Sequence, residues 1–231
     1  FISENGNWFK SVNLNVNWVK STLNRGIFAT RGTSQRIGID AAFPGSGLEY
    51  FKVTYKGSHL RGISRQFTLR LRADLGYGES FGDTSEMPFF KNFYSGGLGS
   101  VRGFKKYSLG PRNSPQSGGY YGGYSSYTRP IGGNVQIILG ADVIFPLPFI
   151  KDQRSVQSSL FFDAGNVFNT KCSDLQVNCF SPEEGELRYS VCVGATWLSG
   201  FGPITFSIAK PLNSVDLDET EVFQFSLGNQ F

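Results

Sequence analysis

Alternation of apolar and polar residues recurs in segment after segment of this chain and constrains its fold more than any other feature. The segment VNLNVNW at 12–18 puts its apolar residues on one face and its three asparagines on the other. The same period of two recurs in RIGIDAAF at 36–43, EYFKVTYKG at 49–57 and QFTLRLRADLG at 66–76. Successive side chains of a β-strand point to opposite faces, so these segments are predicted to be strands with one apolar and one polar face.

About nine such strands are expected, and they predict an all-β fold, a transmembrane antiparallel β-barrel. A soluble β-sandwich is the alternative, with the apolar faces forming a dry core. The polar faces, however, carry Arg, Lys, Asp and Asn, whereas the apolar faces are rich in aromatic and branched residues. Strands of about ten residues that face lipid outside and water inside explain both observations. The expected strands are 11–21, 33–43, 48–57, 65–76, 133–145, 155–166, 187–198, 202–210 and 221–231.

The connections between the expected strands differ in length. Outer-membrane barrels have short periplasmic turns and longer extracellular loops. We therefore expect the long connections to open on one side, outside the cell, and the C-terminus to lie at the periplasmic side. The short connections are near 44–47, 146–148 and 199–203, and the long ones are 77–132, 167–186 and 211–220.

Composition argues against several other classes of protein. No run of about 18 apolar residues predicts a membrane-spanning helix. The net charge is +4 and the basic residues are scattered, so nucleic acid is not an expected partner. His59 is the single histidine and lies in GSHLRG, which reads as a short turn. We therefore expect no enzyme, no cofactor and no metal site.

Two of the three cysteines lie close together in a polar segment. Cys172 and Cys179 belong to TKCSDLQVNCF, between two expected strands. Such a pair predicts a disulfide in an oxidising compartment, with two unpaired loop thiols as the alternative. The third, Cys192, lies inside an expected strand and should pack as a small side chain.

The segment GGLGSVRGF at 96–104 places Arg102 among glycines in the longest expected loop. A phosphate-binding loop would lead into a helix and carry a Lys-Ser/Thr pair, and neither follows here. Alternation in the next two strands points Asp142 and Asp163 to the polar face. Buried carboxylates need partners, and a loop arginine folded into the lumen would supply one. The alternative is a solvated lumen, in which the aspartates contact water and wall arginines such as Arg70 and Arg72.

VRGF in a long late loop resembles the hallmark of outer-membrane protein assembly factors of the BamA type. The resemblance extends to EMPFFKNFYSGG, RGIFATRG, FPGSGLEYFKVTY, FFDAGNVF, GPITFSIAKPLN and VFQFSLGNQF, over essentially the whole chain. Barrels of that family have about sixteen strands. The chain then corresponds to roughly the last nine, with the earlier strands and the periplasmic receptor repeats outside it. The resemblance implies that loop 77–132 enters the lumen and is locked there by Val101, Arg102, Gly103, Phe104, Asp142, Phe161, Asp163 and Gly165.

The final segment also carries a resemblance. Phe223, Phe225, Leu227 and Phe231 share one face, and the chain stops on an aromatic residue, as in the signal strands of outer-membrane proteins. A lipid-facing strand with an aromatic girdle residue would look the same. In the family this strand pairs weakly with the first strand, at a seam that opens laterally. Gly228 fits that weakening, since glycine loosens a strand interior.

The function implied by the resemblance is assembly and insertion of β-barrel proteins into the bacterial outer membrane. Strand templating at the seam and local destabilisation of the bilayer would drive it. The implied partners are outer-membrane lipids, nascent β-barrel clients and accessory assembly lipoproteins, the last through periplasmic domains missing from this chain. The alternative is a protein-secreting or porin-like pore of the same barrel family.

Overall fold

The computed structural model consists mainly of one nine-stranded antiparallel sheet, in which the strands neighbour one another in chain order. It describes residues 10–113, 128–147, 155–172, 176–177 and 186–228. The predicted all-β class is confirmed, and each of the nine predicted strands has a counterpart. The strands are β1 (Asn13–Ser21), β2 (Gly32–Ala42), β3 (Tyr50–Gly62), β4 (Thr68–Ser80), β6 (Val135–Phe145), β7 (Val156–Phe168), β9 (Arg188–Ser199), β10 (Gly202–Pro211) and β11 (Phe223–Leu227).

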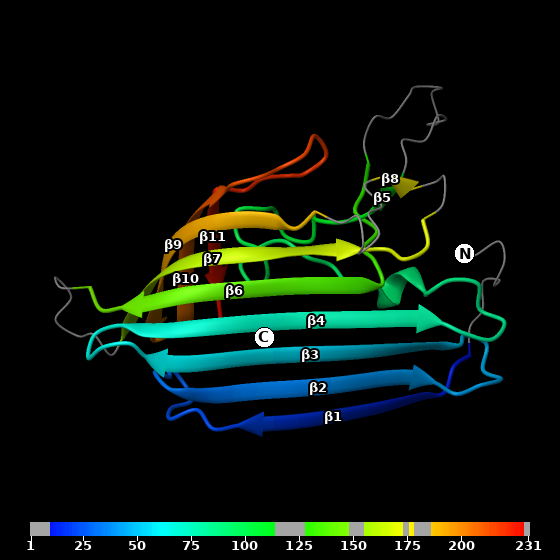
Figure 1. Cartoon of the computed structure of the whole chain (residues 1–231), viewed down its shortest axis with the longest axis horizontal. Helices are drawn as coiled ribbons and strands as arrows, with labels where there is room; N and C mark the ends of the chain where they lie inside the picture. Colours follow the sequence, from blue (N-terminus) through cyan, green and yellow to red (C-terminus); the bar gives the residue numbers. More distant parts are fainter. Residues whose placement is uncertain (1–9, 114–127, 148–154, 173–175, 178–185, 229–231) are drawn as a thin grey trace.

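The sheet is curved. Figure 1 shows β1 to β4, β6 and β7 as long strands side by side, with β9, β10 and β11 curling away behind them. The convex face carries exposed apolar side chains, among them Trp18, Leu71 and Leu160. The concave face carries the polar residues of the alternating pattern, and the connection between β4 and β6 lies against it. Two short strands of the connections, β5 (Arg112–Asn113) and β8 (Gln176–Val177), pair separately.

Two strands continue at least four residues past their predicted ends. β3 continues to Gly62 and β4 to Ser80, beyond the expected ends at 57 and 76. His59 therefore lies inside β3, where its Nδ1 is 2.9 Å from Thr33 Oγ1, and the predicted turn is wrong. Pairing with β2 on one side and β4 on the other keeps this segment in the ladder despite its weak strand propensity.

The long connections lie at one end of the sheet, because the strands alternate in direction. The short turn between β2 and β3 lies at that same end, so short turns are not confined to the opposite end. This turn is attached to the start of the long loop through Glu49, whose carboxylate accepts hydrogen bonds from the Gly45 and Asp83 amides. These two backbone hydrogen bonds lower the pKa of Glu49.

The last strand is shorter than predicted. β11 ends at Leu227, and Gly228 follows it with φ +91°, donating its amide to the Pro203 carbonyl at 2.8 Å. Gly228 therefore supplies a left-handed backbone conformation at the end of β11, and its weakening of the pairing between the last and the first strand stays a prediction. Phe231 lies outside the described residues.

The remaining predictions concern cysteines. Cys192 is buried and packs with Phe161 and Ala209, as expected of a small apolar side chain. Cys179 lies outside the described residues, so its predicted disulfide with Cys172 does too. In the described part of the chain, no helix is long and apolar enough to cross a membrane.

Candidate functional site: a loop arginine between two buried carboxylates

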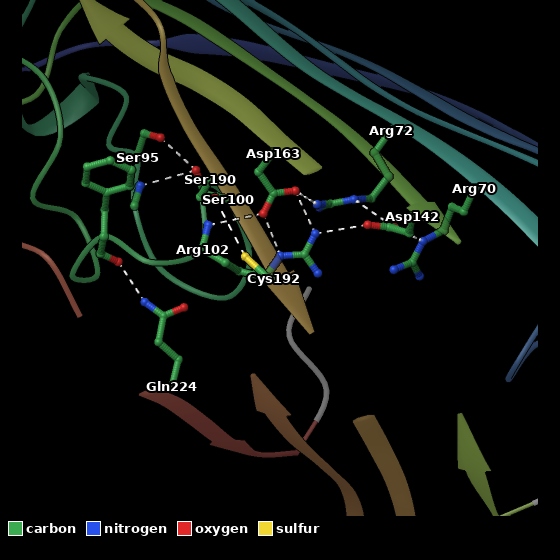
Figure 2. Close-up of polar contacts among 12 residues, drawn as sticks. Arg70, Arg72, Ser95, Ser100, Arg102, Asp142, Asp163, Ser190, Cys192 and Gln224 are labelled. Carbon is green, nitrogen blue, oxygen red and sulfur yellow. Dashed lines mark hydrogen bonds and ion pairs between the residues drawn. The ribbon is translucent and has the colours of Figure 1, made fainter. Parts of the chain in front are cut away.

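Arg102 binds two carboxylates on the concave face of the sheet. Its Nε donates to Asp163 Oδ2 at 2.6 Å, while Nη2 donates to Asp163 Oδ1 at 2.6 Å and to Asp142 Oδ1 at 3.0 Å. The Arg102 backbone amide also donates to Asp163 Oδ2, at 3.2 Å. Figure 2 shows the guanidinium between the two carboxylates. A bidentate contact reinforced by the backbone fixes both the side chain and the loop that carries it.

The two carboxylates come from neighbouring strands. Asp142 of β6 pairs in register with Phe161 of β7, two residues before Asp163, so both aspartates face the same side. Each side chain is completely buried. A buried ionised carboxylate is costly without partners, and this cost explains why several cations converge here.

Two arginines of β4 complete the cluster. Arg70 Nε donates to Asp142 Oδ2, and Arg72 Nη2 donates to Asp163 Oδ1 at 2.8 Å. The sequence left a loop arginine and wall arginines as alternatives, and the structure contains both sets of contacts. Three guanidinium groups thus surround two carboxylates, which gives this cluster a net charge of +1.

Phe161 forms the floor of the cluster. The Arg102 Cζ atom lies 3.4 Å from the centroid of its ring, which is a cation–π geometry. Burial works to lower the pKa of Arg102, but the hydrogen bonds and charges of Asp163 and Asp142 outweigh it and raise that pKa. Arg102 therefore remains a cation at any physiological pH.

Glycines allow the loop to fold back on itself. Gly96 and Gly97 have φ of +107° and +91°, a left-handed backbone that favours glycine. In this conformation the Gly97 amide donates to the carbonyls of Val101 and Phe104, at 3.1 and 2.9 Å. The resulting tight turn presents Arg102 to the wall.

Two further glycines allow close contact between the loop and the strands. A Cβ on Gly165 of β7 would lie 2.7 Å from the Ile137 carbonyl oxygen and 3.0 Å from Val101 Cγ2. Gly103 has φ +91°, and a Cβ there would lie 3.1 Å from the Ala209 Cβ. Both positions therefore require glycine for the observed packing.

An apolar cluster supports the arginine from the loop side. Val101 and Phe104 are fully buried and pack with Leu109 of the same loop and Ile138 of β6. Burying apolar side chains of this size stabilises a contact by about 1.5–3 kcal/mol each. The loop is thus held by an apolar cluster and by the charged contacts together.

The structure also contains contacts that the sequence reasoning missed. The segment between β10 and β11 contributes Glu219, whose carboxylate binds Lys105 Nζ at 2.7 Å and Arg112 Nη2 at 2.9 Å. These hydrogen bonds from Lys105 and Arg112 lower the pKa of Glu219. The opposite charges of Glu219 and of Lys105 and Arg112 were the only sign of this contact in the sequence. No periodic pattern relates the positions of the two loops, so the sequence did not predict the pairing.

A second missed contact involves the 3-10 helix η1 (Phe89–Lys91) of the long loop. Lys91 Nζ donates to Asp40 Oδ2 at 2.9 Å, and the same oxygen accepts the Tyr50 hydroxyl at 3.1 Å. Lys52 Nζ donates to the Lys91 carbonyl at 2.7 Å. The long loop is therefore attached both to β2–β3 and to β6–β7.

The predicted residues of the final strand alternate as expected. Phe223, Phe225 and Leu227 of β11 are exposed on the convex face, while Gln224 is buried on the concave face. The Phe225 ring lies 5.2 Å from that of Phe206 on β10. Within the described residues, no group of three or more His, Cys, Asp or Glu side chains could hold a metal ion.

A curved antiparallel sheet, apolar outside and bound inside by a loop arginine, defines a section of a membrane β-barrel with an inward-folded loop. Residues 2–231 match the Omp85 superfamily domain, and the chain belongs to that family.

The similar proteins carry consistent names. The chain is 38% identical to the outer membrane protein assembly factor BamA of Neisseria meningitidis serogroup B, over 94% of the chain and 28% of that protein. It is 28% identical to BamA of Nitratidesulfovibrio vulgaris, over 63% of the chain and 16% of that protein. The crystal structure of Haemophilus ducreyi BamA lacking POTRA domains 1–3 superposes with a TM-score of 0.82 at 29% identity, covering 97% of this chain and 45% of that one. The chain thus spans about a quarter of the length of the first relative.

Proposed function

We propose that this chain forms the C-terminal portion of an outer-membrane barrel that assembles and inserts other β-barrel proteins. The buried contact of Arg102 with Asp163 and Asp142 is the observation that carries the proposal. It fixes a long loop inside the concave face, where a simple pore would need open space. The relatives named as assembly factors support the same reading.

Templating at a strand edge is the proposed mechanism, and it makes and breaks no covalent bond. β11 has five residues paired with the ten-residue β10, so the last strand is held by a short ladder. An unpaired strand edge offers backbone donors and acceptors to an incoming strand. A short strand flanked by aromatic side chains also favours local thinning of the bilayer, which would lower the barrier to insertion.

The orientation and partners follow from this mechanism. The end of the sheet with the long loops would lie outside the cell, and the C-terminus at the periplasmic side. Outer-membrane lipids would contact the convex face, and nascent β-barrel clients would contact the seam at β11. Accessory assembly lipoproteins would bind periplasmic domains of the parent protein.

Arg102 is assigned the role of a strut that holds the loop against the wall. Removing it would leave Asp163 and Asp142 buried beside Arg70 and Arg72 alone, and would release the backbone contact at Asp163. Loss of one partner from such a cluster costs about 3–5 kcal/mol. The loop would then detach and the active form of the barrel would be depleted.

Folding of a small outer-membrane barrel, with the full-length parent protein in liposomes, tests this proposal. The parent protein should accelerate client folding, Arg102→Ala should abolish most of that acceleration, and Arg102→Lys should retain part of it through its charge. Arg36→Ala, an exposed arginine on the same concave face, is the matched control and should behave as wild type. A large ion conductance without accelerated client folding in any version would instead establish the pore.

A further inference from the structure

The connection between β10 and β11 pairs with the VRGF segment as a strand would. The Lys105 amide donates to the Glu219 carbonyl at 2.8 Å, and the Glu221 amide donates to the Gly103 carbonyl at 2.8 Å. Phe104 and Thr220 form the antiparallel bridge between these two bonds. The backbone on both sides of Phe104 is therefore tied to the residues that lead into the last strand.

Gln224, the first residue of β11 on the concave face, also contacts the VRGF segment (residues 101–104). Gln224 Nε2 donates to the Phe104 carbonyl at 2.7 Å, and this carbonyl also accepts the Gly97 amide at 2.9 Å. Both Gln224 and Phe104 are buried. Figure 2 shows the Gln224 amide extending from β11 toward the loop that carries Arg102.

Ion pairs hold the start of the connecting segment from two sides. Glu219 binds Lys105 and Arg112 of the long loop, and Asp218 Oδ2 accepts Arg188 Nε of β9 at 2.5 Å. Arg188 and Asp218 are nearly inaccessible to solvent, with side-chain exposures of 1% and 4%. The segment 218–224 thus lies between the arginine-bearing loop and the wall, with little freedom to move independently.

β11 has few other attachments. Its ladder with β10 comprises five residue pairs and is extended by one backbone hydrogen bond at each end, from the Ala209 amide to the Val222 carbonyl and from the Gly228 amide to the Pro203 carbonyl. The other edge of β11 is unpaired among the described residues. Such a short ladder contains few backbone hydrogen bonds, so the other contacts of β11 weigh more in holding it. The contacts through 218–224 are therefore a substantial fraction of what holds the last strand in place.

We propose that Gln224 is a positioning residue that couples the Arg102 cluster to the last strand. While Arg102 holds the VRGF turn on the wall, the Phe104 carbonyl holds Gln224 and, with it, β11 against β10. When the turn moves off the wall, this support is lost and β11 is released at its edge. The inference rests on the proposed function, in which β11 borders the opening seam, and it assigns the control of that seam to the loop.

Hydrogen exchange of the full-length parent protein in lipid bilayers tests the coupling, read by mass spectrometry on peptides that cover β11. Arg102→Lys should speed exchange of the β11 amides by about three- to tenfold, the effect of one lost buried hydrogen bond. Gln224→Leu should do the same, and the double variant should add little to either. Ser226→Ala, on the same face of the same strand, is the matched control and should leave exchange unchanged.

Additive effects in the double variant would overturn the coupling. The coupling would also be overturned if Arg102→Lys speeds hydrogen exchange in residues 96–112 but not in β11. Gln224→Asn, which keeps the amide but is too short to reach Phe104, replaces Gln224→Leu if the latter fails to insert, and should give the same non-additivity.

Client folding by the same variants separates this inference from the proposed function. Coupled exchange with no accelerated client folding would leave the coupling standing and refute the assembly role. Accelerated client folding with exchange of β11 independent of Arg102 would refute the coupling alone.

Discussion

The first strand of the sheet and the strands at its middle have the same alternating pattern but differ in what covers their concave faces. On β1 the concave-face residues Asn15 and Asn17 are exposed, whereas on β7 Ser159, Phe161 and Asp163 are buried. The difference arises because the VRGF turn lies against β6 and β7, while the loop reaches the early strands through η1. The alternating pattern therefore predicts which face of a strand points away from lipid. It does not predict whether water or another segment of the chain covers that face.

The polar side chains on the concave faces of β1 and of β6 and β7 differ in the same way as their exposure. Asn15 and Asn17 on β1 are exposed, so water can satisfy their amides. The carboxylates on β6 and β7 are fully buried and bind three guanidinium groups. Charge is retained in the covered region only where partners are present to offset its desolvation.

The largest loss of stability is expected from Arg102→Ala, in the region where the loop covers the concave face. It should destabilise the parent protein by about 3–5 kcal/mol, because two buried carboxylates lose their central partner. Denaturant midpoints in detergent micelles would measure it. Arg36 lies on the same concave face, at a place that no loop of the described residues covers, and Arg36→Ala should change stability by less than about 0.5 kcal/mol. Equal effects of the two substitutions would remove the distinction between covered and uncovered strands.

The second largest loss of stability is expected from a steric clash at Gly165. Gly165→Ala places a Cβ 2.7 Å from the Ile137 carbonyl oxygen and against Val101, so the turn must shift. We expect a loss of about 1–3 kcal/mol in the same denaturation experiment, as in other overpacked sites. Gly200→Ala has open space around the new Cβ and is the matched control. A stable Gly165→Ala variant would show that the turn does not depend on close approach to β7.

The contact with the early strands should be weaker. Lys91→Met removes the hydrogen bond to Asp40 at a side chain that is 30% exposed, and should cost about 1 kcal/mol. Faster hydrogen exchange confined to 85–95 would report the release of η1, with exchange near Arg102 unchanged. Exchange that increases equally in both regions would mean that the loop detaches as one unit.

The smallest expected effect depends on pH. Glu219 has a lowered pKa, so its contribution is present above its unfolded value of about 4.3 and is lost as pH falls through the lower folded value. The carboxylate is partly exposed, so the loss should be under about 1 kcal/mol. Exchange in 103–112, compared between pH 6 and pH 3.5, should speed up in the wild type more than in Glu219→Gln. An identical pH response in both would exclude this ion pair as the cause.

Several features could be predicted from the sequence because they depend on a local period. Alternation identified nine strands and, by parity alone, placed Asp142 and Asp163 on the face that Arg102 contacts. It failed where local signals are weak: His59 stays in a strand because β2 and β4 pair with its segment on both sides. The parity of a strand is a property of its own residues, so it needs no knowledge of the rest of the molecule.

Tertiary structure alone decided how the loops meet. Gln224 lies 120 residues from Phe104, and Glu219 is 114 residues from Lys105, with no periodic relation between them. The curvature of the sheet brings these segments together on the concave face, and curvature is set by the twist of all the strands at once. The sequence by itself therefore determined which face each side chain takes, whereas the contacts across the concave face required the folded sheet, since they join segments that no local pattern connects.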